Sequence, residues 1–118
     1  MITNFEQITA ELNDKELEML PLVIACFNRY TKDNPIKEPD VVQRFNNNCP
    51  GMKLTGVRLR KIVNHIRSNG LIPLIATSKG YYVSYDRAEI ESQIKSLRER
   101  ANSIHRCADG LGCMLNGL

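Results

Sequence analysis

Residues 53–85 decide the fold and read KLTGVRLRKIVNHIRSNG followed by LIPLIATSKGYYVSY. The first part predicts a helix over about residues 55–69, because apolar side chains recur with the period of an α-helix. Thr55 is a favourable N-cap, and Gly70 is a natural stop. The apolar stripe consists of Leu59, Ile62, Val63 and Ile66. Leu54, just before the helix, can form a hydrophobic staple with Leu59.

The second part of this stretch predicts a short β-hairpin. Residues 72–77 and 81–85 are rich in strand-forming side chains, and Ser78-Lys79-Gly80 between them is a turn sequence. We expect Tyr81 and Tyr82 to pack within the hairpin rather than to stack on bases.

An earlier helix is predicted over residues 14–30, with Asp14 as its N-cap. Pro21 lies inside this segment, so we expect it to kink the helix or to divide it. The apolar residues follow spacings of three, four and three, which places them on one face. They are Leu17, Leu20, Ile24 and Phe27.

A second helix is predicted to begin near Pro39, which suits a first helical turn, and to end at about Asn46. Residues 46–51 then form a polar loop. Before this helix, Asp33-Asn34-Pro35 is a turn signal, and Ile36 is a candidate for a very short strand. The apolar face of the second helix consists of Val41, Val42 and Phe45.

The last helix is predicted over about residues 86–108. Its apolar residues alternate spacings of four and three, a heptad-like seam that suits a coiled-coil dimer or packing within one chain. The flanking residues Arg98, Arg100 and His105 offer no acidic match to a second copy. We therefore expect the seam to be buried mainly against the first helix of the same chain, with a homodimer as the alternative. The seam consists of Ile90, Ile94, Leu97, Ala101, Ile104, Ala108 and Leu111.

These elements predict a mainly α fold with a small β-hairpin, arranged as a winged helix-turn-helix plus a long C-terminal helix. A chain of 118 residues suits one hydrophobic core. We expect residues 1–13 to form an N-terminal extension and residues 14–111 to form the winged-helix domain. The glycine-containing residues 112–118 should form a flexible tail.

Charge is distributed unevenly between the two halves of the chain. Residues 1–50 carry five Lys or Arg and eight Asp or Glu, whereas residues 51–118 carry eleven and five. A basic half suggests an anionic partner, and the alternative is an uneven but merely solvated surface. The sequence contains neither a signal-peptide pattern nor an apolar run of membrane-spanning length, so we expect a cytoplasmic protein without a membrane partner.

The predicted third helix carries the candidate DNA-binding residues. On a helical wheel, polar and basic side chains lie opposite the apolar stripe, and no acidic residue occurs between Lys53 and Tyr85. Arg, Lys and Asn provide the donors that base edges need, and lysines near the helix start and in the hairpin turn can contact phosphates. The candidate residues are Lys53, Thr55, Val57, Arg58, Arg60, Lys61, Asn64, His65, Ser68 and Lys79.

Several segments of the chain resemble small winged-helix proteins of phages, prophages and mobile elements. These segments are Arg60–Arg67, Gly70, Ile75–Tyr82, Glu89 and Leu97–Ala101. The resemblance covers roughly residues 14–111. It implies the winged-helix fold and a role in binding DNA for replication or regulation. Winged helices also serve as protein-interaction modules, so an adaptor with an acidic protein partner is the alternative function.

Other chemistry finds little support in the sequence. The four cysteines form no CxxC pair, and His105, Cys107 and Cys113 do not follow a common zinc-ligand spacing. We therefore expect free thiols and no metal site. The glycines of residues 110–117 do not form a nucleotide-binding loop, and no nucleophile–base pair is indicated. We expect no enzymatic activity and no cofactor.

Overall fold

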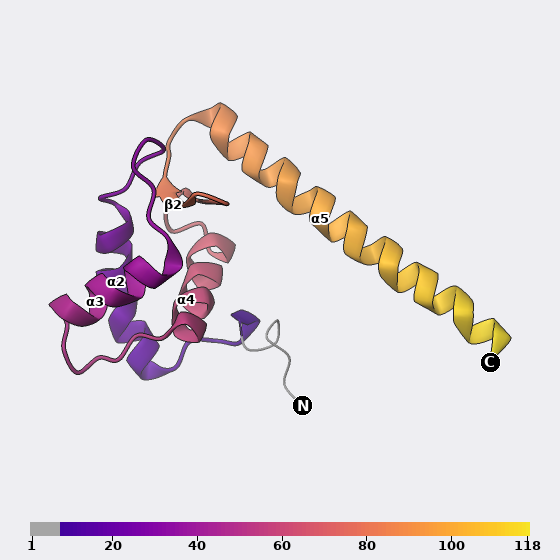
Figure 1. The fold of residues 1–118 in the computed structure, drawn as a ribbon, viewed down its shortest axis with the longest axis horizontal. Helices are drawn as coiled ribbons and strands as arrows, with labels where there is room; N and C mark the ends of the chain where they lie inside the picture. Colours follow the sequence, from indigo (N-terminus) through magenta and orange to yellow (C-terminus); the bar gives the residue numbers. More distant parts are fainter. Residues whose placement is uncertain (1–7) are drawn as a thin grey trace. The chain divides into compact units, whose positions relative to one another are not determined.

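The computed structural model describes residues 8–118, which form two compact units divided between Tyr85 and Asp86. In the described part, the fold is mainly helical, with a small antiparallel sheet and a long C-terminal helix (Figure 1). The first unit contains α2 (Asp14–Phe27), α3 (Glu38–Asn48), α4 (Gly56–Ser68), β1 (Leu74–Thr77) and β2 (Gly80–Val83). The second unit contains α5 (Arg87–Met114) and the short 3-10 helix η1 (Leu115–Gly117).

Residues 1–7 of the predicted N-terminal extension lie outside the described residues. Helix α2 begins as predicted but has Asn13, not Asp14, as its N-cap. The Asn13 side chain accepts a hydrogen bond from the Glu16 N–H at 2.8 Å, and the Asn13 N–H donates to Glu16 Oε1 at 3.0 Å. This reciprocal pair is a capping box, which satisfies two backbone donors at the helix start.

Pro21 lies inside α2 without dividing it, because the helix is one element from Asp14 to Phe27. The predicted buried face of this helix is partly wrong. Phe27 is buried, but Leu17 is 47% exposed, and the other buried apolar residues are Met19 and Val23. Apolar side chains occupy almost every position of the second half of this helix, so its sequence period alone does not define which stripe is buried.

Helices α3 and α4 follow their predictions closely. Pro39 lies in the first turn of α3, but the helix extends to Asn48, so residues 46–48 are helical rather than part of the predicted loop. Helix α4 has Thr55 as its N-cap, with the hydroxyl accepting from the Arg58 N–H at 3.2 Å. Gly70 follows the helix with φ of +61°, the left-handed conformation that suits a helix stop.

The hairpin is confirmed, with strands somewhat shorter than predicted. Thr77 pairs with Gly80, so the turn itself consists of Ser78 and Lys79. Ile36, the candidate for a very short strand, forms an isolated antiparallel bridge with Tyr81. The Ile36 N–H donates to the Tyr81 carbonyl at 2.9 Å, and the Tyr81 N–H donates to the Ile36 carbonyl at 2.7 Å.

The core of the first unit lies between its three described helices and the hairpin. Phe27 of α2 meets Tyr81 of β2 edge-on, with ring centroids 5.3 Å apart, and Tyr82 is buried. Both tyrosines therefore pack as expected. The side chains that are less than 2% exposed are Phe27, Met19, Leu59, Ile62, Ile66, Val23 and Val41.

Helix α5 differs most from expectation. It extends beyond the predicted end at Ala108 to Met114, so residues 112–114 of the predicted tail are helical. None of its residues is buried, and the prediction of a buried seam is wrong. Ile94 and Leu97 are 40% and 39% exposed, Ile104 is 69% exposed, and Ile90 is half-buried. A heptad period places apolar side chains on one face of a helix but does not specify what covers them.

No helix within residues 8–118 combines the length and the apolar character needed to cross a lipid bilayer.

Candidate nucleic-acid interface

The polar face of α4 is the centre of the candidate interface. Its residues Val57 and Ser68 are exposed, with Val57 exposed by 41%, and Asn64 and His65 are half-buried. The Asn69 side chain donates to the His65 carbonyl at 2.9 Å and lies 3.4 Å from His65 Nδ1. The side chains that are expected to face DNA are therefore at least partly accessible along α4. They are the hydrogen-bonding side chains of Asn64, His65 and Ser68 and the apolar side chain of Val57.

Lys61 does not extend freely from this face. Its ammonium donates to Glu16 Oε1 at 2.7 Å, and its side chain is only 15% exposed. The Glu16 side chain is 3% exposed, so the pair connects the start of α2 to the middle of α4 away from bulk water. The Lys61 side chain is therefore largely covered, and its charge has a partner within the chain.

Glu16 has an unusual electrostatic environment for a carboxylate. Burial raises the pKa of Glu16, but the hydrogen bond from Lys61, the backbone donor of Asn13 and the charges of Lys61 and Arg58 outweigh burial and lower it. The carboxylate is thus held ionised by three neighbouring residues. Its role is to fix α2 against α4, in addition to capping α2.

Arg60 is also neutralised by a residue from another element. Its guanidinium lies 3.1 Å from Glu38 Oε1, and the two side chains are 39% and 30% exposed. The stretch between Lys53 and Tyr85 lacks acidic residues in sequence, yet α2 and α3 each bring one carboxylate to α4. Neighbouring residues in the sequence do not indicate these two ion pairs, because Glu16 and Glu38 lie far from α4 along the chain.

The loop that leads into α4 holds Lys53 in an unusual conformation. Lys53 is exposed and has φ of +58°, the only positive φ of a non-glycine residue among residues 8–118. The Arg58 guanidinium donates to the Lys53 carbonyl at 2.9 Å. Asn46 fixes the next residue, donating to the Leu54 carbonyl at 2.9 Å and accepting from the Leu54 N–H at 2.8 Å. Three side-chain hydrogen bonds therefore hold this strained loop in place.

The start of α4 combines groups that favour an anion with one carboxylate from α3, because Glu38 Oε1 lies 3.5 Å from the position that a Cβ of Gly56 would occupy. The first turn contains no acidic residue, and its free N–H groups give this end of the helix a partial positive charge. Thr55 uses its hydroxyl to cap the helix, so it contributes to this end mainly as a structural residue. Exposed Lys53 adds a full charge beside it. A phosphate is the simplest group that such a helix start can hold.

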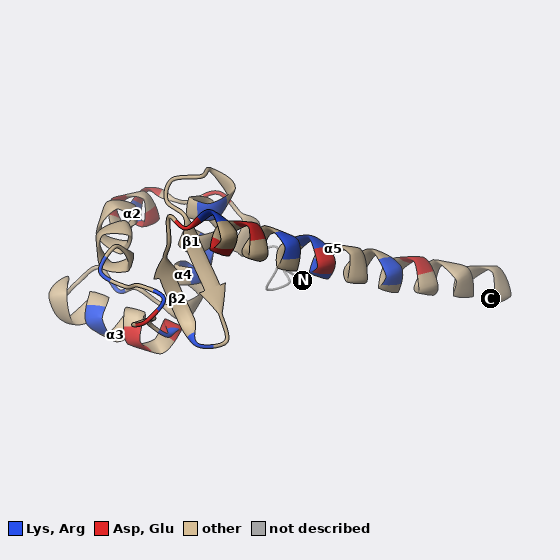
Figure 2. Cartoon of the chain, turned by 90° about the horizontal axis from the view of Figure 1, so that it is seen from above, with Lys and Arg blue, Asp and Glu red and all other residues tan. Residues whose placement is uncertain are grey.

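Lys79 lies in the two-residue turn of the hairpin and is exposed. Its backbone N–H donates to the Thr77 hydroxyl at 3.2 Å, and that hydroxyl lies 3.2 Å from the Gly80 carbonyl. These contacts stiffen the turn and leave the ammonium in solvent. Figure 2 shows the blue of Lys and Arg at this turn. Within residues 8–118, neither Lys53 nor Lys79 takes part in an ion pair.

The predicted site residues lie on α4, in its leading loop and in the hairpin turn, some exposed and others half-buried, and the prediction missed the residues that support them. The missed residues are Glu16, Glu38 and Asn46, each of which contacts α4 or its leading loop from another helix. The capping pattern Asn13-x-x-Glu16 was the available signal for Glu16. No local pattern marks Glu38 or Asn46.

Among residues 8–118, the remaining cysteine, histidine and acidic side chains form no cluster suited to metal binding. Burial raises the pKa of Cys26, against the charges of Arg29 and Arg44, so this thiol is a poor nucleophile. All four cysteines are free thiols.

Comparisons with models of protein families, with curated proteins and with solved structures find no match to this chain.

Proposed function

We propose that this chain binds double-stranded DNA as a winged helix-turn-helix protein, with α4 in the major groove and the hairpin as the wing. The order of elements supports this proposal, since three helices are followed by a hairpin and Ile36 bridges to β2. Helices α3 and α4 provide the helix-turn-helix. Their connection, residues 49–55, is longer than the turn of about 3–4 residues in the simplest motif.

The observation that carries the proposal is the pair of exposed lysines Lys53 and Lys79, which form no ion pair with any residue of 8–118. One lies at the positive start of α4 and the other in the hairpin turn, the two places where a winged helix contacts the DNA backbone. The charges of Arg60 and Lys61 are satisfied by Glu38 and Glu16. We therefore assign these two residues to holding α4 in place rather than to phosphate contacts.

Base contacts are assigned to the accessible face of α4. Arg58 uses a single guanidinium nitrogen on the Lys53 carbonyl, so other donors of its five stay available for a guanine. Asn64 suits an adenine edge, and Val57 suits a thymine methyl group. His65 and Ser68 extend the same face toward the end of the helix. A regulatory or replication role in a phage or mobile element, as the sequence resemblance implies, is part of this proposal.

Phosphate contacts predict a defined salt dependence. The full chain should bind a random-sequence duplex with an affinity that falls steeply as salt is raised, because each neutralised phosphate releases counterions. Lys53→Gly and Lys79→Ala should each weaken binding to every duplex and reduce the slope by about one unit. Glycine is chosen at position 53 because it accepts φ of +58° without strain, so stability should not fall. Fluorescence anisotropy at several salt concentrations measures both quantities.

Lys95→Ala is the matched control, since Lys95 is an exposed lysine of α5 that pairs with Glu99. Its slope should equal that of the unchanged protein. Absence of salt-dependent binding at tens of micromolar protein would reject the DNA proposal. An adaptor that meets an acidic protein through the same lysines would then be the better account.

A further inference from the structure

Helix α5 carries a heptad seam, and among residues 8–118 none of the residues of this helix is buried. Large apolar residues repeat at every seventh position, and the intervening seam positions include two alanines. Most helices in proteins owe their stability to packing of an apolar face, and Gly110 and Gly112 weaken this helix further. Packing of a partner along the seam would therefore stabilise this helix. The repeated large residues are Ile90, Leu97, Ile104 and Leu111, and the alanines are Ala101 and Ala108.

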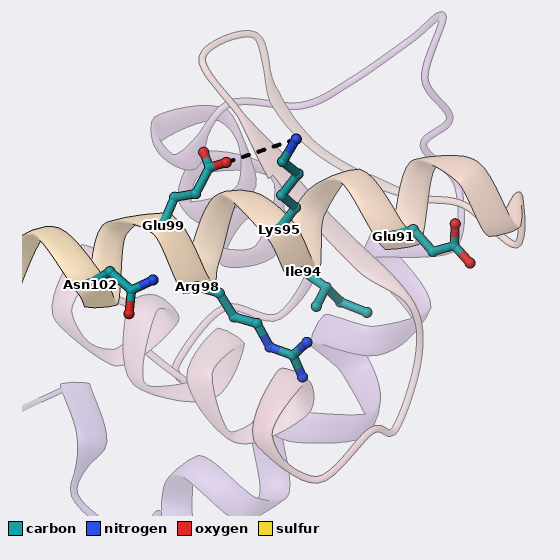
Figure 3. A pocket seen from close by; sticks show the side chains of 6 residues that line it. All are labelled: Glu91, Ile94, Lys95, Arg98, Glu99 and Asn102. Carbon is teal, nitrogen blue, oxygen red and sulfur yellow. Dashed lines mark ion pairs between the residues drawn. The ribbon is translucent and has the colours of Figure 1, made fainter.

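The Lys95–Glu99 ion pair of α5 lies off this seam, whereas Arg98 projects from the same side of the helix as the seam residue Ile94 (Figure 3). Lys95 pairs with Glu99 at 4.0 Å, and neither residue belongs to a seam position. Figure 3 shows these two side chains reaching toward each other on one side of the helix, while Ile94 and Arg98 project from the other. Residues 86–118 carry five acidic and five basic side chains, so two copies of this segment do not repel each other by net charge.

We propose that the seam binds the α5 helix of a second copy of this chain in an antiparallel coiled coil. Side-chain size decides the direction. In a parallel pair, each residue faces its own copy, so Ala101 and Ala108 form two layers of small residues that leave space unfilled. In an antiparallel pair, each alanine faces a large residue of the other heptad position, and well-packed interfaces alternate large and small residues in this way.

One register pairs all the seam residues from Ile94 to Leu111. Ala101 lies opposite Ile104 of the second copy, Ala108 opposite Leu97, and Ile94 opposite Leu111. The flanking residues do not choose between the two directions, because the antiparallel register places Arg98 beside His105 of the second copy and the parallel pair places Arg100 beside His105. This interface is independent of the DNA-binding proposal, since it uses no residue of α4 or of the hairpin.

Sedimentation equilibrium of the full chain tests association. The unchanged protein should be a dimer of the 13.4 kDa chain. Ile104→Asp places two carboxylates beside the two-fold axis and should weaken dimerisation by at least about 100-fold, because an aspartate cannot be buried unpaired in an apolar layer. Ser103→Asp introduces the same charge at the next position, outside the seam, and should leave the dimer intact. A monomeric unchanged protein at hundreds of micromolar, or equal effects of both variants, would overturn the proposal.

Disulfide mapping tests the direction. In a chain that carries both Leu97→Cys and Ala108→Cys, the two new thiols lie eleven residues apart, about 16 Å along one helix, so they cannot bond within one chain. Mild oxidation should link the new thiol at position 97 of one copy to the new thiol at position 108 of the other. Bonds that join position 97 to 97 and position 108 to 108 would show a parallel pair and contradict the antiparallel register.

Discussion

Replacing Gly80 with alanine should destabilise the folded chain by about 2–6 kcal/mol, because backbone strain and a steric clash add at this position. Gly80 has φ of +128°, a conformation that residues with a Cβ rarely adopt. A Cβ at this position would lie 2.5 Å from the Ile36 carbonyl oxygen and 2.7 Å from the Ile36 carbonyl carbon. Relief requires the backbone of Ile36 to move, and this breaks its two hydrogen bonds with Tyr81.

Gly51→Ala is the matched control for this substitution. Gly51 also has a positive φ, +98°, but nothing lies within 4 Å of the position that its Cβ would occupy. Its change to alanine should cost only the backbone strain, roughly 1–2 kcal/mol. Urea unfolding followed by circular dichroism gives both values. Equal losses for the two variants would show that Ile36 and Gly80 are not in close contact.

The second large effect concerns the ion pair between Glu16 and Lys61. Glu16→Ala should destabilise the chain by about 2–4 kcal/mol, because it leaves the largely covered Lys61 ammonium without its partner and opens the capping box of α2. Lys61→Met should reduce the stability of the fold by less than Glu16→Ala, since methionine replaces the methylene chain of Lys61 with an apolar side chain of similar length. The double variant should lose less than the sum of the two single losses. Additive losses in this double-mutant cycle would show that the pair is not coupled.

The same pair predicts how stability changes with pH. Burial raises the pKa of Glu16, but the Lys61 and Asn13 hydrogen bonds outweigh it, so the folded-state pKa is below the unfolded value of about 4.3. A lowered folded-state pKa contributes stability that is fully present above the unfolded value and is lost as the pH falls through the folded value. Glu16→Gln keeps an acceptor but no charge. The stability advantage of the unchanged protein over Glu16→Gln should therefore shrink as the pH falls below about 4.

Local sequence patterns predicted most elements of the first unit. The apolar period and caps of α4, the turn sequence of the hairpin and the short bridge at Ile36 all appear in the structure, because each depends on neighbouring residues. The predicted face of α2 was partly wrong because Leu17 and Met19 both fit an apolar stripe, and only packing selects Met19. The sequence predicted the heptad spacing of the α5 seam but not its exposure, since a heptad repeat does not specify which surface covers it.

The candidate site was harder to predict than the fold. The sequence indicated which residues lie on the polar face of α4, but not that Glu16 and Glu38 would neutralise Lys61 and Arg60. These contacts join residues 45 and 22 positions apart, so they depend on how the helices pack. The positive φ of Lys53 also has no local sequence signal, and it occurs in a loop held by hydrogen bonds between Asn46 and Leu54 and from Arg58 to Lys53.

Chemical-shift mapping with a random-sequence duplex at low salt tests the DNA-binding proposal most directly. The isotope-labelled full chain should show its largest amide shifts at residues 53–58 and at the turn residues Ser78 and Lys79. The outer residues of α5 around Ser103 should change little. Shifts confined to α5 or to the acidic start of α3, or no shifts at all, would contradict the proposal that α4 and the hairpin bind DNA.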